Sequence, residues 1–546
     1  MADTSENKGQ VSRRSFVAGI AGVSLGLASL AGGLTACSPK QENAVSSGEP
    51  VANGTPISTV PESVAESLDC DIVIVGAGIS GLACAVQAAQ DGNKVLVLEK
   101  GAMAGGNGIG TEGVFAIGSK MQLEQGIEIT PSDIISAELE ESQYRGDGSL
   151  WLNLCENSAG NIEWLQENGV KFSGIVDNYH TGLFATMHWF EESDGSLGGA
   201  SYIAPMVATA ERLGVEFRYE IKAYLLVQDA GQVTGLYAED LATGEHIQVN
   251  ARAVILASGG VGANPELLKR QGWQQRNIDE KISMCMPTVE GDGYLMAMAA
   301  GGNDYLAYSC DQAFIGIKAL GTDTTPPYSS MLNGGNGIGG CGPTLWVNQD
   351  ALRFNDESIT HFNMAALEPA CRGNRMSYTM FDQSIVDTFI TDPEDLAFLN
   401  NAVADPTNSD SIVVADTYEA LAENFGLDVE TFVASVERYN SYCQSGNDLD
   451  FGKDSQFMVS LTNAPYYMAN IVPLFVVLIG GIMTNIRAEV LGEELTAIPG
   501  LYAVGLDGAM MHKNVYTQNM PGSNMGNNVN AGRNAAKSAT AYIKGV

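Results

Sequence analysis

The stretch that decides the fold is DIVIVGAGISG at residues 71–81, in which a run of β-branched residues leads directly into three glycines. Residues 82–91 follow with the apolar spacing of a helix, and residues 94–98 form a second apolar run that ends at Glu99. A G-x-G-x-x-G pattern alone is a weak signal. Here it lies between a predicted strand and a predicted helix, with an acidic residue 18 positions after its last glycine. The stretch therefore predicts a βαβ unit that binds a dinucleotide.

Each glycine of this turn has a separate physical task. Gly76 permits a tight turn, Gly78 allows the backbone to approach a pyrophosphate at the helix N-terminus, and Gly81 allows the helix to pack closely on the strand. Glu99 is expected to accept hydrogen bonds from ribose hydroxyls. The alternative is an ordinary βαβ crossover without a ligand.

Five later motifs indicate which dinucleotide is bound. They are GGN at 105–107, EGV at 112–114, AVILASGG at 253–260, GDG at 291–293 and GLYAVG at 500–505. With the first turn, they resemble the FAD-binding flavoprotein superfamily of fumarate reductase, succinate dehydrogenase and 3-ketosteroid dehydrogenase. Within it, the chain is similar to exported bacterial enoate and enone reductases such as cardiac glycoside reductase. The resemblance runs from Asp69 to Val546.

The resemblance implies FAD as the cofactor. The family's cofactor-binding Glu after the last glycine motif is Leu506 here, so Asp507 is the expected substitute. The expected cofactor-binding residues are Gly76, Gly78, Gly81, Glu99, Lys100, Gly105, Gly106, Asn107, Gly113, Ala223, Ser258, Gly259, Gly260, Asp292, Asp507, Asn528 and Val529.

The resemblance also implies the domain organisation. The C-terminal motif must return to the sheet of the first strand, so the fold class is α/β: a discontinuous Rossmann-like FAD-binding domain at 69–308 and 475–546, with an inserted α+β capping domain at 309–474. Ligands in such proteins bind at the domain interface. Within the capping domain, residues 418–442 have the apolar spacing of an amphipathic core helix.

The N-terminus is typical of an export signal rather than of a folded domain. Residues 12–16, SRRSF, precede small and apolar residues up to Ala36, which predicts a twin-arginine signal peptide at 1–36. Cys37 follows a lipobox-like LTA, which predicts a lipid anchor, and 37–68 is predicted to be a flexible tether. The expected location is the outer face of the cytoplasmic membrane or the periplasm. The alternative is a chance arginine pair before a membrane-anchoring helix.

Composition limits the partners. The chain of 546 residues has 28 Lys and Arg against 64 Asp and Glu, a net charge of −36 that disfavours nucleic acid. Its nine cysteines contain no C-x-x-C, so no motif for an iron–sulfur cluster, a haem or a metal site is present. Electrons must therefore come from a separate donor, for which a membrane cytochrome is the predicted partner.

The substrate motifs of fumarate reductases are only partly present. Arg353–Glu357 matches the family's R-F-x-N-E, but His361 stands where the proton-donating Arg is expected. Val476 replaces a carboxylate-binding His, and residues 521–528, PGSNMGNN, lack the clamping Arg. Because paired cations are needed to hold a dianion, the sequence argues against fumarate as the substrate.

The remaining pocket is expected to be apolar with neutral hydrogen-bonding groups. The expected substrate residues are Asn333, Val476, His512, Asn519, Met520 and Met525. The predicted reaction is hydride transfer from flavin N5 to a conjugated C=C bond of an enone, unsaturated lactone or conjugated acid, followed by proton delivery. His361 and Tyr516 are the alternative proton donors, and Arg353 is the third expected catalytic residue, with bracing of the cap as its alternative role.

Two other functions stay open. One is the reverse reaction, a ketosteroid-type dehydrogenase that introduces a C=C bond. The other is a non-catalytic lipoprotein that binds a solute.

Overall fold

The structure, a computed structural model, describes residues 59–179, 182–191, 200–320, 338, 342–361, 366–390 and 393–545. The predicted export signal, Cys37, most of the tether and Asn333 lie outside these ranges. No helix in the described ranges combines the length and the apolar character that a bilayer crossing needs.

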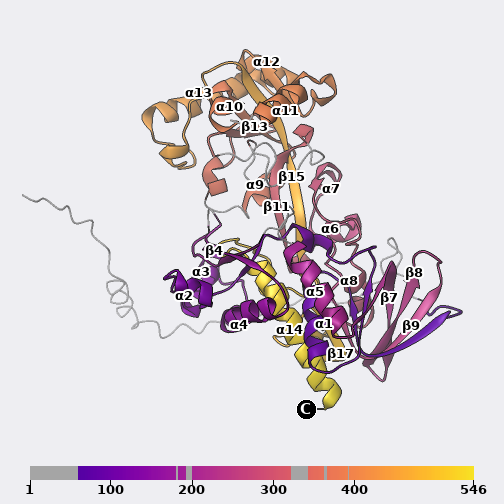
Figure 1. Ribbon diagram of the computed structural model, residues 1–546. Helices are drawn as coiled ribbons and strands as arrows, with labels where there is room; N and C mark the ends of the chain where they lie inside the picture. Colours follow the sequence, from indigo (N-terminus) through magenta and orange to yellow (C-terminus); the bar gives the residue numbers. More distant parts are fainter. Residues whose placement is uncertain are drawn as a thin grey trace, which may run out of the picture. The chain divides into compact units, whose positions relative to one another are not determined.

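The nucleotide-binding unit is built on an eight-stranded sheet (Figure 1). β1 (Glu66–Val75) lies between β2 (Val95–Glu99) and β9 (His246–Leu256), and both neighbours run parallel to it. β17 (Ala497–Ala503) pairs in parallel with β9, although the capping unit described below lies between these two strands in the sequence. The sheet is completed by β6 (Glu216–Tyr219), β7 (Ile221–Asp229), β8 (Gln232–Asp240) and β16 (Glu489–Leu491).

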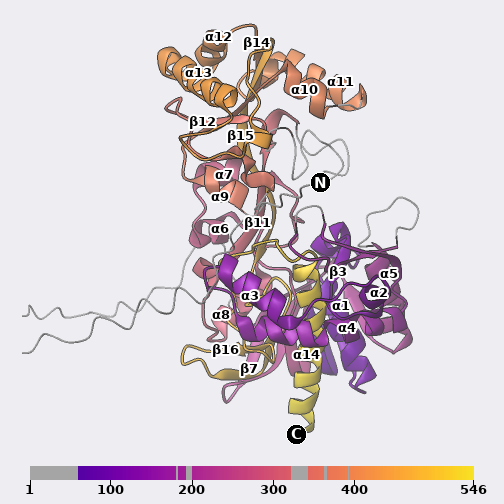
Figure 2. The ribbon, with the colours of Figure 1, turned by 90° about the vertical axis from the view of Figure 1, so that its left-hand side faces the viewer.

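Helices cover one face of the sheet, and strands together with helices cover the other face. α1 (Ile79–Gln90) packs against α14 (Ser523–Lys544) and α5 (Ala200–Arg212), and this group shares one core with α4 (Gly148–Glu167) (Figure 2). The opposite core contains β7 and β8 together with α6 (Pro265–Gln271), α7 (Gln275–Glu280) and α8 (Asp292–Ala299).

The capping unit has its own sheet and its own core. Its strands are β10 (Ile282–Ser283), β11 (Cys310–Ile317), β12 (Leu345–Asn348), β13 (Ser377–Asp382), β14 (Ile412–Ala415) and β15 (Tyr466–Ile479). Its helices are α9 (Leu367–Arg372), α10 (Gln383–Phe389), α11 (Pro393–Ala404), α12 (Tyr418–Phe425) and α13 (Val429–Ser445).

β11 and β15 connect the two units. They pair antiparallel from Cys310 opposite Ile479 to Ile317 opposite Ile471. The first residues of β15 belong to the cap core, whereas Phe475 and Leu478 belong to the core under the main sheet. The interruption of a Rossmann-like unit by an α+β insertion is therefore confirmed, and the expected boundary at 474/475 falls inside one continuous strand.

A small third sheet stands beside the glycine turn. β3 (Gly113–Phe115) pairs with β5 (Met187–Phe190), which pairs with β4 (Phe172–Asp177). α2 (Lys120–Glu124) and α3 (Pro131–Glu141) follow β3 in the chain. Gly113 of β3 and Met187 and Trp189 of β5 line the site described next.

Candidate functional site

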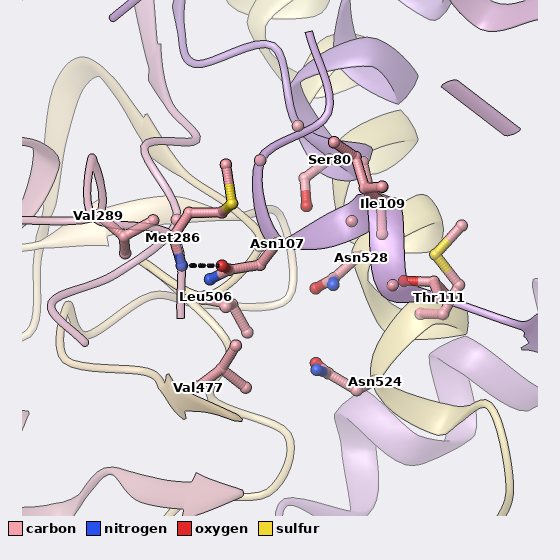
Figure 3. A pocket seen from close by; sticks show the side chains of 18 of the residues that line it. Ser80, Asn107, Ile109, Thr111, Met286, Val289, Val477, Leu506, Asn524 and Asn528 are labelled. Atoms are coloured by element: carbon pink, nitrogen blue, oxygen red, sulfur yellow. Dashed lines mark hydrogen bonds between the residues drawn. The ribbon is translucent and has the colours of Figure 1, made fainter. Parts of the chain in front are cut away.

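A cavity of about 780 Å³ lies where the glycine turn, the third sheet, β11, β15 and the start of α14 meet (Figure 3). Most of the predicted site residues line it. From the cofactor set these are Gly76, Gly78, Glu99, Lys100, Gly105, Gly106, Asn107, Gly113, Ala223, Ser258, Gly259, Asp292 and Asn528. From the substrate and catalytic sets they are Val476, Met520, Met525 and Tyr516.

The glycine turn has the shape that a bound pyrophosphate requires. Gly76 has φ +105°, and a Cβ there would lie 2.8 Å from the carbonyl carbon of Ala257 and nearer still to its oxygen. A Cβ on Gly78 would meet nothing nearer than 3.7 Å, so this residue leaves the turn open toward the cavity. Gly81 lies behind the turn, where it allows α1 to contact Gly76.

Glu99 holds the turn against the end of β2. Its Oε2 accepts from the Ala77 N–H at 2.7 Å and its Oε1 from the Gly101 N–H at 2.7 Å. Burial raises the pKa of Glu99, and these backbone donors oppose the shift. The carboxylate lines the cavity, where it could also accept ribose hydroxyls as predicted.

The cations of this region are already paired. Lys100 Nζ lies 3.0 Å from Asp292 Oδ2 and also pairs with Glu290, and Lys222 Nζ lies 3.3 Å from Asp292 Oδ1. Burial alone would lower the pKa of Lys100, but the neighbouring Asp292 and Glu290 raise this pKa above its ordinary value. Asp292 thus anchors both lysines at the start of α8.

Asp507 is placed behind the cavity wall rather than in it. Its carboxylate accepts from Ser258 N at 2.5 Å, Ser258 Oγ at 3.1 Å and Gly260 N at 3.0 Å. Burial raises its pKa to about 6, although these hydrogen bonds oppose the shift. Asp507 therefore shapes the Ser258–Gly260 loop. Gly81, Gly260 and Val529 likewise are not among the described lining residues.

Polar atoms at the start of α14 face the cavity without hydrogen-bond partners in the described part of the chain. Asn524 Oδ1 and Asn528 Oδ1 are buried and accept no hydrogen bond from the described residues, and both side chains point inward in Figure 3. Because buried polar groups are normally satisfied, these amides are suited to a polar ligand. With the open turn at Gly78, they fit a bound dinucleotide.

The substrate end of the cavity is apolar and aromatic. β11 and β15 contribute Phe314, Val476 and Val477. Trp189 of β5 and Tyr179, in the turn after β4, also line this end, and their rings stack at 5.4 Å. The only cations among the described lining residues are the two lysines already paired with Asp292. The described wall therefore has no free cation for a dicarboxylate.

Several of these lining residues were not among the predicted site residues. Asn524 lies within the quoted PGSNMGNN segment, where its polarity was the available signal. Gln518 lies between the predicted residues Tyr516 and Asn519, and its Nε2 is buried without a hydrogen-bond partner among the described residues. Tyr179 and Trp189 reach the cavity because β5 pairs with both β3 and β4.

Two predicted substrate residues lie behind the wall. His512 is buried, and its ring packs edge-on against Tyr516 at 4.7 Å and Trp151 at 5.6 Å. Neither ring nitrogen has a hydrogen-bond partner within the described part, and burial lowers the pKa of His512 to about 3. Asn519 holds the loop, because its carbonyl accepts from Leu183 N at 2.9 Å.

This histidine predicts a loss of stability in acid. The pKa of His512 in the folded protein lies below the ordinary value near 6.5. Its contribution to the free energy of unfolding is therefore present above pH 6.5 and is lost as the pH falls toward 3. When the pH is lowered from 7 to 4, the free energy of unfolding is expected to fall by roughly 3 kcal/mol less in His512→Leu than in the wild type. Thermal melts at several pH values test this. Equal acid limbs for the wild type and His512→Leu would contradict the expectation.

Arg353 takes the bracing role. Its Nε and Nη2 donate to Glu357 at 2.8 and 2.7 Å, and Nη1 lies 2.9 Å from Asp448. Its guanidinium lies between the rings of Tyr439 and Phe451. Arg353 is not among the described cavity residues, and its contacts are those expected of the bracing role. The short helix Glu357–His361 ends at His361, whose side chain lies outside the described part, as does Asn333.

Comparisons with known proteins agree with this geometry. The family model described as FAD binding domain matches residues 71–517. Vinyl phenol reductase of Lactiplantibacillus plantarum is 31% identical over 490 residues, which cover 86% of this chain and 96% of that protein. Urocanate reductase of Eggerthella lenta is 30% identical, with 80% of this chain and 69% of that protein covered.

A solved structure supports the fold. The open conformation of a flavocytochrome c3 fumarate reductase superposes with a TM-score of 0.65 at 23% identity, over 88% of this chain and 79% of that one. The predicted resemblance and the FAD cofactor are thereby confirmed.

Proposed function

The chain belongs to the family of the FAD binding domain, and from this premise we propose that it reduces the conjugated C=C bond of a largely apolar enone, unsaturated lactone or conjugated acid other than fumarate. The observation that carries this proposal is the lining of the substrate end. Aromatic, aliphatic and amide side chains form it, and the cavity's two described lysines are both paired with Asp292.

The similar reductases support the same reaction type. Vinyl phenol reductase shares nearly its whole length with this chain, and its name specifies an alkene on a neutral aromatic ring. The stacked Tyr179 and Trp189 rings offer a surface on which such a planar conjugated group could pack.

The reaction needs one hydride and one proton. When bound and reduced by two electrons, FAD would supply the hydride that forms a C–H bond at one alkene carbon, while the alkene π electron pair takes up a proton at the other carbon. We assign proton delivery to Tyr516, because its side chain lines the cavity and a phenol can donate a proton. Val476, Val477 and Phe314 exclude water from the reacting atoms, and an external reductant restores the two electrons.

The proposal also includes export by the twin-arginine pathway and lipidation at Cys37. A membrane cytochrome is the proposed external reductant. These three proposals rest on the sequence patterns at 12–16 and 34–37 and on the lack of any haem or cluster motif in the chain.

Anaerobic assay with reduced viologen tests the function. Aryl alkenes, enones and unsaturated lactones are compared with fumarate, and at least one neutral substrate is expected to exceed fumarate in kcat/KM by roughly 100-fold. A parallel assay offers saturated ketones with a dye acceptor. Dye reduction alone would favour a ketosteroid-type dehydrogenase, in which Tyr516 would act as a base. Tight ligand binding without flavin reoxidation would favour a solute-binding protein.

A further inference from the structure

Glu138 is a buried carboxylate directly behind the substrate wall. It belongs to α3 and is only 3% exposed. Its Oε1 and Oε2 accept from the Thr517 hydroxyl at 2.8 and 3.0 Å. No other donor and no cation pairs with this side chain within the described part of the chain.

Stability alone does not account for this arrangement. Burying a carboxylate with one hydroxyl donor is costly, and an apolar side chain would be less so. Burial raises the pKa of Glu138 to about 7 against the opposing effect of Thr517. In some proteins a buried polar group of this kind fixes one conformation at a cost in stability.

Thr517 stands at the point where such control matters. Its chain neighbours Tyr516 and Gln518 both line the cavity. Gln518 has φ +59°, a left-handed conformation that a non-glycine residue keeps only when its surroundings impose it. The Thr517 hydroxyl also accepts a hydrogen bond from Asn519 N at 3.3 Å. The same oxygen therefore contacts both the Glu138 carboxylate and the backbone of Asn519.

We propose that Glu138 is a positioning residue: through Thr517 it fixes the backbone of 516–518 and thereby aims Tyr516 and Gln518 into the cavity. The inference rests on the proposed function only in giving Tyr516 a substrate to act on. The position of the segment can be measured without turnover.

Two pairs of variants of the FAD-loaded protein test the contact. Thr517→Val removes the hydroxyl at nearly constant volume, and Thr517→Ser keeps it. Glu138→Leu removes the acceptor, and Glu138→Gln keeps one. The matched control is Glu140→Gln, on the exposed face of the same helix.

Thr517→Val and Glu138→Leu are each expected to lower kcat by roughly 10- to 100-fold with KM changed less than about threefold. The double variant should be no slower than the worse single variant. Thr517→Ser and Glu138→Gln should recover most of the rate. Hydrogen exchange of the 516–520 amides should quicken in the first pair and stay at the wild-type rate in Glu140→Gln.

The outcomes separate this inference from the proposed function. Faster exchange at 516–520 without any alkene turnover would keep the positioning role and remove the proposed function. Unchanged exchange in both Thr517→Val and Glu138→Leu would overturn the positioning role even if alkene reduction is found. So would equal losses in the conservative variants and the disruptive ones.

Discussion

Gly81→Ala is expected to yield protein that purifies without flavin and retains less than about a thousandth of the activity. A Cβ at Gly81 would lie 3.0 Å from the carbonyl carbon of Gly76 and nearer still to its oxygen, which is backbone and cannot rotate away. α1 would have to move off the turn, and the helix N-terminus that receives the pyrophosphate would move with it. The absorbance ratio of flavin to protein, followed by titration with FAD, measures the loss.

Gly160→Ala is the matched control. Gly160 lies in the exposed face of α4, and a Cβ there would meet nothing within 4 Å. This variant should keep full flavin and gain slightly in stability, because alanine is the better helix former. Wild-type flavin content in Gly81→Ala would mean that the turn does not hold the cofactor.

The cofactor half of the site could be predicted from sequence because its signals are local. The strand, the glycines and Glu99 lie within thirty residues of one another, and the structure brings them together as expected. β1 nevertheless begins at Glu66, before the predicted run. Its first residues alternate in burial and pair with β9 from Glu66 opposite Ile247, a signal that a search for continuous apolar runs misses.

The expected helix over 418–442 is two helices in the structure. α12 ends at Phe425 and is capped by Gly426, which adopts φ +64°. α13 begins after Asp428, whose side chain accepts from Thr431 N. The apolar period continued across the break, but a glycine with an aspartate two residues later is a stop and a start signal. Local chemistry here was stronger than periodicity.

The substrate half could be predicted only in character. Its wall is assembled from the third sheet, β11, β15 and the segment before α14, so no single motif contains it. The absence of the cationic residues that bind a dicarboxylate could be predicted, because the family motifs show at which positions those residues are expected. The role of Asp507 could not be predicted, because only the folded chain shows that Ser258 and Gly260 donate to its carboxylate.

Tyr516→Phe is expected to lower kcat for alkene reduction by roughly 10²- to 10⁴-fold, the range that a positioned acid contributes. The substitution keeps the ring that packs against His512 and removes only the hydroxyl. FAD content and the rate of flavin reduction by viologen should stay at wild-type values, because those steps need no proton from this side chain. Stopped-flow measurement of the two half-reactions separates the effects.

Tyr308→Phe supplies the comparison, because Tyr308 is 58% exposed and is not among the described cavity residues. It should react like the wild type in both half-reactions. If Tyr516→Phe also reacts like the wild type while His361→Gln is slow, the proton comes from the short helix Glu357–His361. If Tyr516→Phe is slow and shows a larger solvent deuterium isotope effect on alkene reduction, proton transfer has become rate-limiting. That result would identify the Tyr516 hydroxyl as the group that delivers the proton.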